Sequence, residues 1–174
     1  GRGSILLTRE CFLSKVQERN PGVNKLNLEN TLSKYFNLKN FIWLNKGIKG
    51  DDTHGHIDDI ARFVSPNTIM AAIEKNKKDK NFKNLNENLQ ILKKSNNTNG
   101  KKFRIIKIPM PKPIYINNVQ VPASYLNFYI ANKIILLPFF NDKHDKMAFS
   151  IFKRFFKKRR IVPINCSELI WGFG

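Results

Sequence analysis

The sequence repeats one plan of strands and a helix about every 60 residues. Three aromatic or β-branched segments, which begin near residues 41, 103 and 160, each close a unit of the pattern strand–strand–helix–strand. Repetition at a fixed period indicates that each unit buries its apolar face against its neighbours. The pattern therefore predicts an α/β fold, an α/β propeller of ββαβ units, rather than a doubly wound sheet in which single strands and helices alternate.

The expected elements follow from two periodicities. Helices carry apolar residues three and four positions apart, whereas strands are short runs rich in β-branched and aromatic residues. In chain order, the first unit comprises Ile5–Thr8, Cys11–Leu13, a helix over Leu26–Phe36 and Phe41–Leu44; the second comprises Ile60–Val64, Thr68–Ile73, a helix over Asn81–Lys94 and Phe103–Ile108; the third comprises Leu126–Ala131, Ile134–Leu137, a helix over Lys143–Lys157 and Arg160–Pro163.

These units give a domain plan. We expect a single partial domain over residues 1–174, with units at 1–46, 47–109 and 110–165 and the start of another at 166–174. Because three units are few for a closed ring, we expect the chain to be part of a longer protein.

Composition excludes two classes of protein. Hydrophobic residues make up 41% of the chain, with 14 Phe, which rules out wholesale disorder. Apolar stretches such as Ile134–Phe140 are far shorter than the ~20 residues that span a bilayer, so no membrane role is expected. The two cysteines, Cys11 and Cys166, cannot form a disulfide framework and favour a reducing compartment, the cytoplasm. Both sit in apolar runs, which indicates buried thiols rather than nucleophiles.

The net charge of +18 invites an anionic partner. Lys and Asn dominate the polar residues, however, which is typical of a coding bias spread over solvated faces. The best candidate for nucleic-acid contacts is Lys153–Arg160, and its alternative is the charged end of a helix whose phenylalanines are buried. We regard a nucleic-acid partner as the less favoured alternative.

One loop is acidic, in contrast to the positive net charge of the whole chain. Gly50–Asp59 holds four of the 13 acidic residues and two of the three histidines, and Gly50 and Gly55 free its backbone. Three interpretations stay open: a site where carboxylates pair with a small cation and His moves protons, a metal site, or a polar turn whose Asp residues fix the geometry. The spacing matches no specific metal motif.

Two blocks of sequence give a family resemblance. The segment 50–63, with Gly55-His56-Ile57-Asp58 inside it, resembles the signature block of the agmatine deiminases and bacterial peptidylarginine deiminases, which belong to the guanidine-modifying pentein superfamily. The segment 122–132, with Ser124-Tyr125-Leu126-Asn127, agrees as well. The resemblance implies a five-bladed α/β propeller of ββαβ units, of which about three blades are present, and it covers essentially the whole chain.

The resemblance also implies a reaction. It suggests a hydrolase that converts agmatine and water to N-carbamoylputrescine and ammonia through a covalent Cys intermediate, with deimination of peptidyl-arginine as the alternative. It implies no metal and no organic cofactor, and it leaves a homo-oligomer open. His56 matches the proton-transfer residue and Asp58 the guanidinium-binding carboxylate; on an extended segment these two side chains would point the same way and face one site. Asn127 matches a site residue, with a buried amide that satisfies backbone groups as its alternative. Asp52 is a further candidate for substrate binding, with a solvated turn as its alternative.

Three features depart from the family pattern. The family's nucleophilic Cys lies in a Gly-x-x-His-Cys block, which we expect to follow Gly174, and Cys166 does not match it. His54 stands where the family usually has an acidic or amide residue, and Asp59 stands where it usually has Asn. The two substitutions bear on substrate detail.

Overall fold

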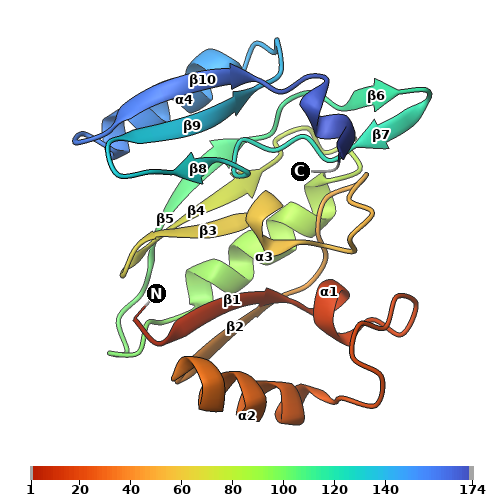
Figure 1. The fold of residues 1–174 in the computed structure, drawn as a ribbon, viewed down its shortest axis with the longest axis vertical. Helices are drawn as coiled ribbons and strands as arrows, with labels where there is room; N and C mark the ends of the chain where they lie inside the picture. The colour runs from red at the N-terminus through yellow and green to blue at the C-terminus, as the bar shows by residue number, and fades with distance from the viewer. Residues whose placement is uncertain (1, 173–174) are drawn as a thin grey trace.

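The computed structural model describes residues 2–172, and its elements stack in three α/β layers (Figure 1). The first layer contains the parallel strands β1 (Ser4–Thr8) and β2 (Asn40–Leu44), with Ser4 opposite Asn40. Two helices, α1 (Arg9–Leu13) and α2 (Lys25–Phe36), connect these strands. The first layer is thus a two-stranded parallel sheet covered by a helix.

The second layer is a three-stranded sheet in the order β3-β4-β5. A single 3₁₀ turn, η1 (Ile57–Asp59), leads into β3 (Ala61–Ser65), which pairs antiparallel with β4 (Thr68–Ile73). Helix α3 (Phe82–Lys94) then crosses over to β5 (Arg104–Pro109), which runs parallel to β4.

The third layer repeats this arrangement. The short strand β8 (Tyr129–Ile130) pairs antiparallel with β9 (Ile134–Phe139), and α4 (Asp145–Phe155) leads to β10 (Arg160–Asn165), which is parallel to β9. A hairpin of β6 (Ile114–Ile116) and β7 (Val119–Val121) precedes this sheet, and η2 (Leu169–Gly172) comes after it.

The helices join the layers. Helix α3 contacts β4 of its own sheet and β2 of the layer before it, and α4 likewise contacts β10 and β5. The buried residues Leu85, Leu89 and Leu92 lie on one face of α3, as the sequence pattern predicted. Because α3 and α4 each pack against two sheets, the main hydrophobic core runs through all three layers. A smaller, separate cluster of Leu7, Leu28 and Trp43 lies in the first layer.

The expected ββαβ pattern is confirmed in the second and third layers and is wrong in the first. Cys11–Leu13, expected as a strand, lies in α1, because the Thr8 side chain caps that helix by accepting a hydrogen bond from the Cys11 N–H at 3.1 Å. The apolar residues Tyr35 and Phe36 at the end of α2 are exposed. Helix α2 covers only the two strands β1 and β2, so a narrower stripe of its surface is buried.

The basic segment Lys153–Arg160 begins in the last part of α4 and runs to the start of β10. Its aromatic side chains belong to the core, since Phe156 is buried and Phe155 half-buried, and both pack against other rings. Phe156 is therefore not available to a partner at the surface, whereas Phe155 lines a hollow together with Arg154 and Lys157. Among residues 2–172, no helix is both long and apolar enough to cross a membrane.

Candidate functional site

The acidic loop lies at the carboxyl ends of β1 and β2, where it connects the first layer to the second (Figure 1). One hydrogen bond fixes this loop to the end of β1, where the Thr8 hydroxyl donates to the Gly55 carbonyl at 2.6 Å. A second fixes the segment that leads into the loop to α1, where the Gly47 N–H donates to Glu10 Oε2 at 2.7 Å. The end of β1 and the start of α1 therefore determine where this loop sits.

Two asparagines of α3 bind the backbone of residues 45–47, which lead from β2 into the acidic loop. Asn88, which is buried, accepts a hydrogen bond from the Asn45 N–H at 2.8 Å and donates to the Lys46 carbonyl at 2.7 Å. One turn earlier, Asn84 donates to the Gly47 carbonyl at 3.2 Å. The amide side chains thus satisfy backbone groups that no strand could pair, as buried polar groups require.

Close backbone approaches explain the glycines. A Cβ on Gly47 would lie 2.4 Å from the Gly55 Cα, and a Cβ on Gly50 would lie 2.5 Å from the Gln120 carbonyl oxygen in the β6–β7 hairpin. Gly50 and Gly55 also adopt left-handed backbone angles, with φ of +97° and +78°. The loop is therefore confined between α1 and the hairpin.

The Asp51 carboxylate fixes the shape of the loop by accepting hydrogen bonds from other residues within it. Its Oδ1 accepts hydrogen bonds from the Thr53 N–H at 2.9 Å and from the Thr53 hydroxyl, and its Oδ2 accepts one from the His56 N–H at 2.6 Å. Its neighbour Asp52 is exposed. The structure thus gives the two carboxylates different environments, with Asp51 closing the loop and Asp52 facing solvent.

His56 and Asp58 face each other, with His56 Nδ1 4.0 Å from Asp58 Oδ1. Both side chains are nearly half exposed, at 41% and 45%, so a ligand from solvent can reach them. The sequence predicted this pair on an extended segment, which is wrong, because Ile57–Asp59 forms a 3₁₀ turn. The turn nevertheless brings the imidazole and the carboxylate to the same place.

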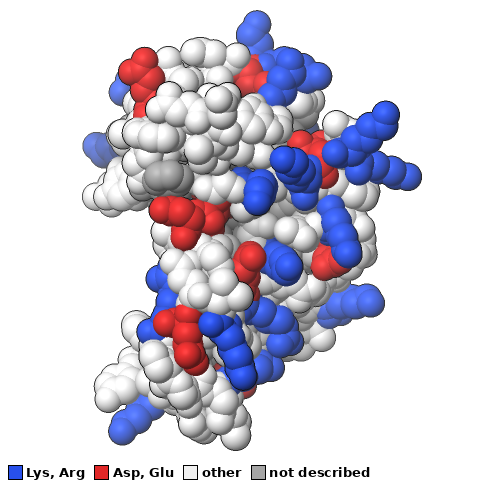
Figure 2. Space-filling view, turned by 90° about the vertical axis from the view of Figure 1, so that its right-hand side faces the viewer, with Lys and Arg blue, Asp and Glu red and all other residues white. Residues whose placement is uncertain are grey.

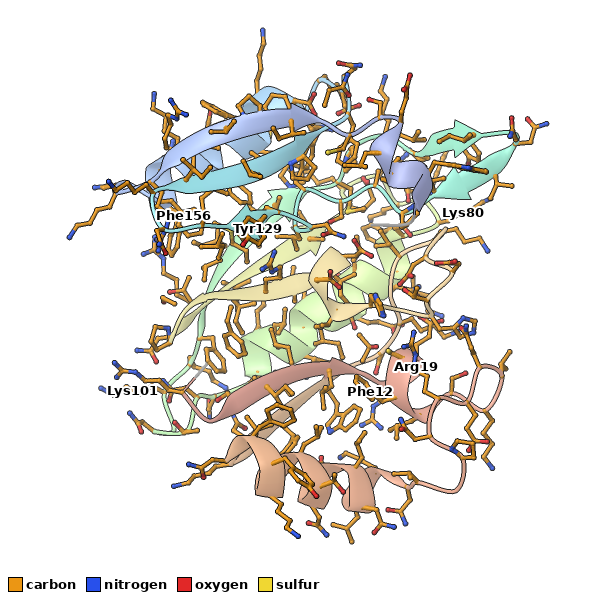
Figure 3. All side chains as sticks on the ribbon, viewed as in Figure 1. Phe12, Arg19, Lys80, Lys101, Tyr129 and Phe156 are labelled. Carbon is orange, nitrogen blue, oxygen red and sulfur yellow. The ribbon has the colours of Figure 1, made fainter. Side chains whose placement is uncertain are left out.

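Arg19 is a member of the site that the sequence did not single out. It lies beside α1, at the same end of β1 as Phe12 (Figure 3), and its Nη2 donates to the Thr53 carbonyl at 2.7 Å. The same nitrogen lies 3.4 Å from His56 Nε2. His56 therefore has a guanidinium on one side of its ring and a carboxylate on the other.

Asn127 reaches the loop from the segment before β8. Its Nδ2 lies 3.4 Å from Asp59 Oδ1, and the Ser124 hydroxyl donates to the Asp59 carbonyl at 2.7 Å. Arg62 fixes the same segment, since its guanidinium lies 4.3 Å from the centre of the Phe128 ring and donates to the Phe128 carbonyl. Asn127 is exposed, so the alternative of a buried amide is wrong.

The electrostatics of the site follow from burial and crowding of carboxylates. Asp59 is 3% exposed, and burial, together with the charges of Asp58 and Asp51, raises the pKa of its carboxyl to about 8. Acidic side chains gather in the middle of the face that carries the loop, with lysines and arginines around them (Figure 2). A positive ligand is therefore favoured at this place in a protein of net charge +18.

The cysteines lie in apolar surroundings, as the sequence indicated. Burial raises the pKa of the Cys11 thiol, with smaller contributions of both signs from Arg19 and Asp51, and burial also raises the pKa of the Cys166 thiol. His54 adopts a left-handed conformation with φ of +61° and lines a different hollow, together with Glu87. Among the residues that the structure describes, no group of three His, Cys, Asp or Glu side chains is placed to hold a metal ion.

The arrangement of mixed α/β layers recurs in solved structures of proteins named as deiminases. An agmatine deiminase from C. Jejuni with substrate bound is 32% identical and superposes with a TM-score of 0.91 over 100% of this chain and 50% of that one. An agmatine deiminase of Enterococcus faecalis, 27% identical, gives a TM-score of 0.91 over 99% of this chain and 51% of that one. The fold is thus the mixed α/β fold of the guanidine-modifying deiminases.

The sequence comparison agrees with the fold. The family described as Porphyromonas-type peptidyl-arginine deiminase matches residues 1–174, and the chain belongs to this family. A relative from Legionella pneumophila (strain Paris), named "Putative agmatine deiminase", is 37% identical over 175 residues, which cover 100% of this chain and 50% of the relative. The chain spans about half the length of the curated relatives it matches.

Proposed function

We propose that the protein is a deiminase of guanidinium compounds, and that the whole enzyme hydrolyses agmatine to N-carbamoylputrescine and ammonia. The observation that carries this proposal is the solvent-accessible pair of His56 and Asp58, 4.0 Å apart on a loop that Asp51 closes. Support comes from the named agmatine deiminases whose fold and sequence the chain shares.

The carboxylates bind the substrate cation. Asp58 accepts hydrogen bonds from the planar guanidinium, which carboxylates orient well because two N–H groups can meet two oxygens. Asp52, exposed and on the same loop, adds a second negative charge, and Asn127 contributes a neutral amide from the opposite segment. Together these groups hold the guanidinium carbon in place for attack.

His56 moves the protons. A Cys thiolate attacks the guanidinium carbon, and protonated His56 then donates a proton to the leaving nitrogen, so that ammonia departs and a covalent amidino-thioether remains. Neutral His56 next removes a proton from water, which attacks the same carbon and releases the thiol and the ureido product. We place this Cys outside residues 1–174, because burial raises the pKa of both thiols present.

The same proposal extends to the fold of the whole enzyme. We infer a five-bladed propeller, to which the segments 1–46, 47–109 and 110–165 each contribute a blade and residues 166–174 the start of the next. The helices α3 and α4 support this inference, because each bridges its own sheet to the preceding one, as a ring of blades requires. Such a ring buries the outer faces of the first and last sheets described here.

Deimination of peptidyl-arginine is the second candidate, and the description of the matching family favours it. The two substrates share the guanidinium and differ at the far end of the carbon chain that carries it, which bears a free amine in agmatine and a peptide backbone in peptidyl-arginine. In the proposed mechanism, the site residues described above bind only the shared guanidinium. The choice therefore depends on how the far end of the substrate is bound.

Product assays on the full-length protein test both reactions. We expect ammonia release from agmatine at a higher kcat/KM than from an arginyl peptide, and the reverse order would favour the second candidate. His56→Ala should lower kcat by roughly 10²- to 10⁴-fold, as loss of a general acid–base does. His54→Ala is the matched control, two residues away, and should retain most activity. An unchanged rate in His56→Ala would refute the assigned mechanism.

A further inference from the structure

Asp59 is a buried acid within the proposed site to which the mechanism gives no task. It is the last residue of η1 and is only 3% exposed, directly beside Asp58. Its side chain accepts a hydrogen bond from Asn127 Nδ2 at 3.4 Å, and its carbonyl accepts one from the Ser124 hydroxyl at 2.7 Å. Asp59 thus joins the loop that carries His56 to the segment that carries Asn127.

The charges around Asp59 oppose its ionisation. Asp58 and Asp51 on the same loop are both negative. Arg62, the nearest cation along the chain, directs its guanidinium to the carbonyls of Leu126 and Phe128. Within residues 2–172, no Lys or Arg forms an ion pair with Asp59. Burial, followed by the charges of Asp58 and Asp51, outweighs the smaller lowering by the Asn127 hydrogen bond and raises the pKa of this carboxyl to about 8.

We propose that Asp59 is a positioning residue for Asn127, and that it performs this role as a neutral carboxylic acid. The inference rests on the proposed function, because Asn127 is assigned there to the substrate. A neutral Asp59 accepts the amide hydrogen bond without placing a buried negative charge beside the carboxylates of Asp58 and Asp51. Once it ionises, the carboxylate must be hydrated, the turn η1 has to open, and both Asp58 and Asn127 move away from their places.

The kinetic test compares pH profiles of the full-length wild type and Asp59→Asn. Asn keeps the accepting oxygen but cannot ionise, so we expect its alkaline limit of kcat/KM to lie at least one pH unit above that of the wild type. The wild type should lose about tenfold per pH unit above its limit. Asp79→Asn changes a carboxylate outside the acidic loop, one that accepts a hydrogen bond from the Asn81 N–H just before α3; it is the control and should keep the wild-type profile. Identical profiles for wild type and Asp59→Asn would overturn the proposal.

An NMR titration gives a readout that does not depend on activity. The side-chain amide resonances of Asn127 in the full-length wild type should shift with a midpoint near pH 8, and they should stay constant in Asp59→Asn. Constant resonances in the wild type would also overturn the proposal. If the protein deiminates neither agmatine nor an arginyl peptide at any pH, the proposed function fails, while this titration still decides whether Asp59 controls Asn127.

Discussion

Asp51 Oδ2 accepts a hydrogen bond from the backbone N–H of His56 at 2.6 Å, so that one carboxylate closes a loop of six residues. The neighbouring Asp52 is exposed and remains a proposed substrate ligand. Adjacent acids therefore have separable roles, one in the shape of the site and one at its surface.

Asp51→Asn and Asp52→Asn should consequently differ. Asn at position 51 weakens three hydrogen bonds to Thr53 and His56, each worth about 1.5–3 kcal/mol when the acceptor is charged, and lowers both Tm and kcat/KM, the latter by roughly 10- to 100-fold. Asp52→Asn should raise KM for agmatine without changing Tm. Thermal melts and steady-state kinetics on the two variants measure this; equal effects on Tm would contradict it.

Asn88→Ala removes both amide hydrogen bonds that hold residues 45 and 46. It leaves the half-buried Asn45 N–H and the carbonyl of the exposed Lys46 without these partners, so we expect a loss of roughly 1–3 kcal/mol in the free energy of unfolding. Asn86→Ala, on the exposed side of the same helix, is the matched control and should change stability by less than about 0.5 kcal/mol. Urea unfolding monitored by circular dichroism measures both; a similar change in the two variants would contradict a stabilising role for the two Asn88 hydrogen bonds.

Gly47→Ala tests the close backbone contact between Gly47, which precedes the acidic loop, and Gly55 within it. The added methyl would lie 2.4 Å from the Gly55 Cα, and backbone must move to admit it. We expect a loss of about 1–3 kcal/mol, as in other overpacked sites. Gly172→Ala meets nothing within 4 Å and should be nearly neutral. An unchanged unfolding midpoint in Gly47→Ala would show that the loop yields easily.

The stability of the protein should depend on pH through Asp59. In the unfolded chain the carboxyl releases its proton near pH 3.8, whereas in the folded protein it does so near pH 8. Between these values the folded state holds the extra proton, so the free energy of unfolding falls as pH rises, by up to about 1.4 kcal/mol per pH unit. Asp59→Asn should remove this slope. Chemical unfolding at pH 5, 7 and 9 provides the measurement; parallel curves for the two proteins would be incompatible with a buried neutral acid.

The thiols of Cys11 and Cys166 should be dispensable for the chemistry. Burial raises the pKa of both, so little thiolate is present at neutral pH. In the full-length enzyme, Cys11→Ala with Cys166→Ala should retain deiminase activity within about threefold, with slow reaction of both thiols towards iodoacetamide in the wild type. Abolished turnover with an intact melting transition would place the nucleophile inside these 174 residues.

Much of the fold can be predicted from the sequence because periodicity reports burial. The second and third ββαβ units were predicted within a few residues, except that β8 is shortened to Tyr129–Ile130. The hairpin of β6 and β7 was missed, although its turn residues Asn117 and Asn118 both have positive φ, as a two-residue hairpin turn requires. Adjacent asparagines between two short apolar runs were the signal.

The site was predicted in its residue types more than in its geometry. His56, Asp58 and Asn127 were singled out, and the structure places His56 and Asp58 together and Asn127 against the adjoining Asp59. Arg19 and Asp51 were missed, because their roles depend on backbone groups that approach only after folding. Asn88 was not predicted, because the chain has many asparagines. Its hydrogen bonds to residues 45 and 46 depend on its burial, which composition does not reveal.

The hydrogen bonds that hold the loop connect residues far apart in the sequence. Thr8 and Gly55 are 47 residues apart, and Ser124 and Asp59 are 65 residues apart. Links of this kind form late in folding, after the sheets have come together. The loop should also be the first part to open, so the amide hydrogen of His56 should exchange with solvent faster than those of the buried strand β4. In rising denaturant, the protein should therefore lose its site before it loses its sheets.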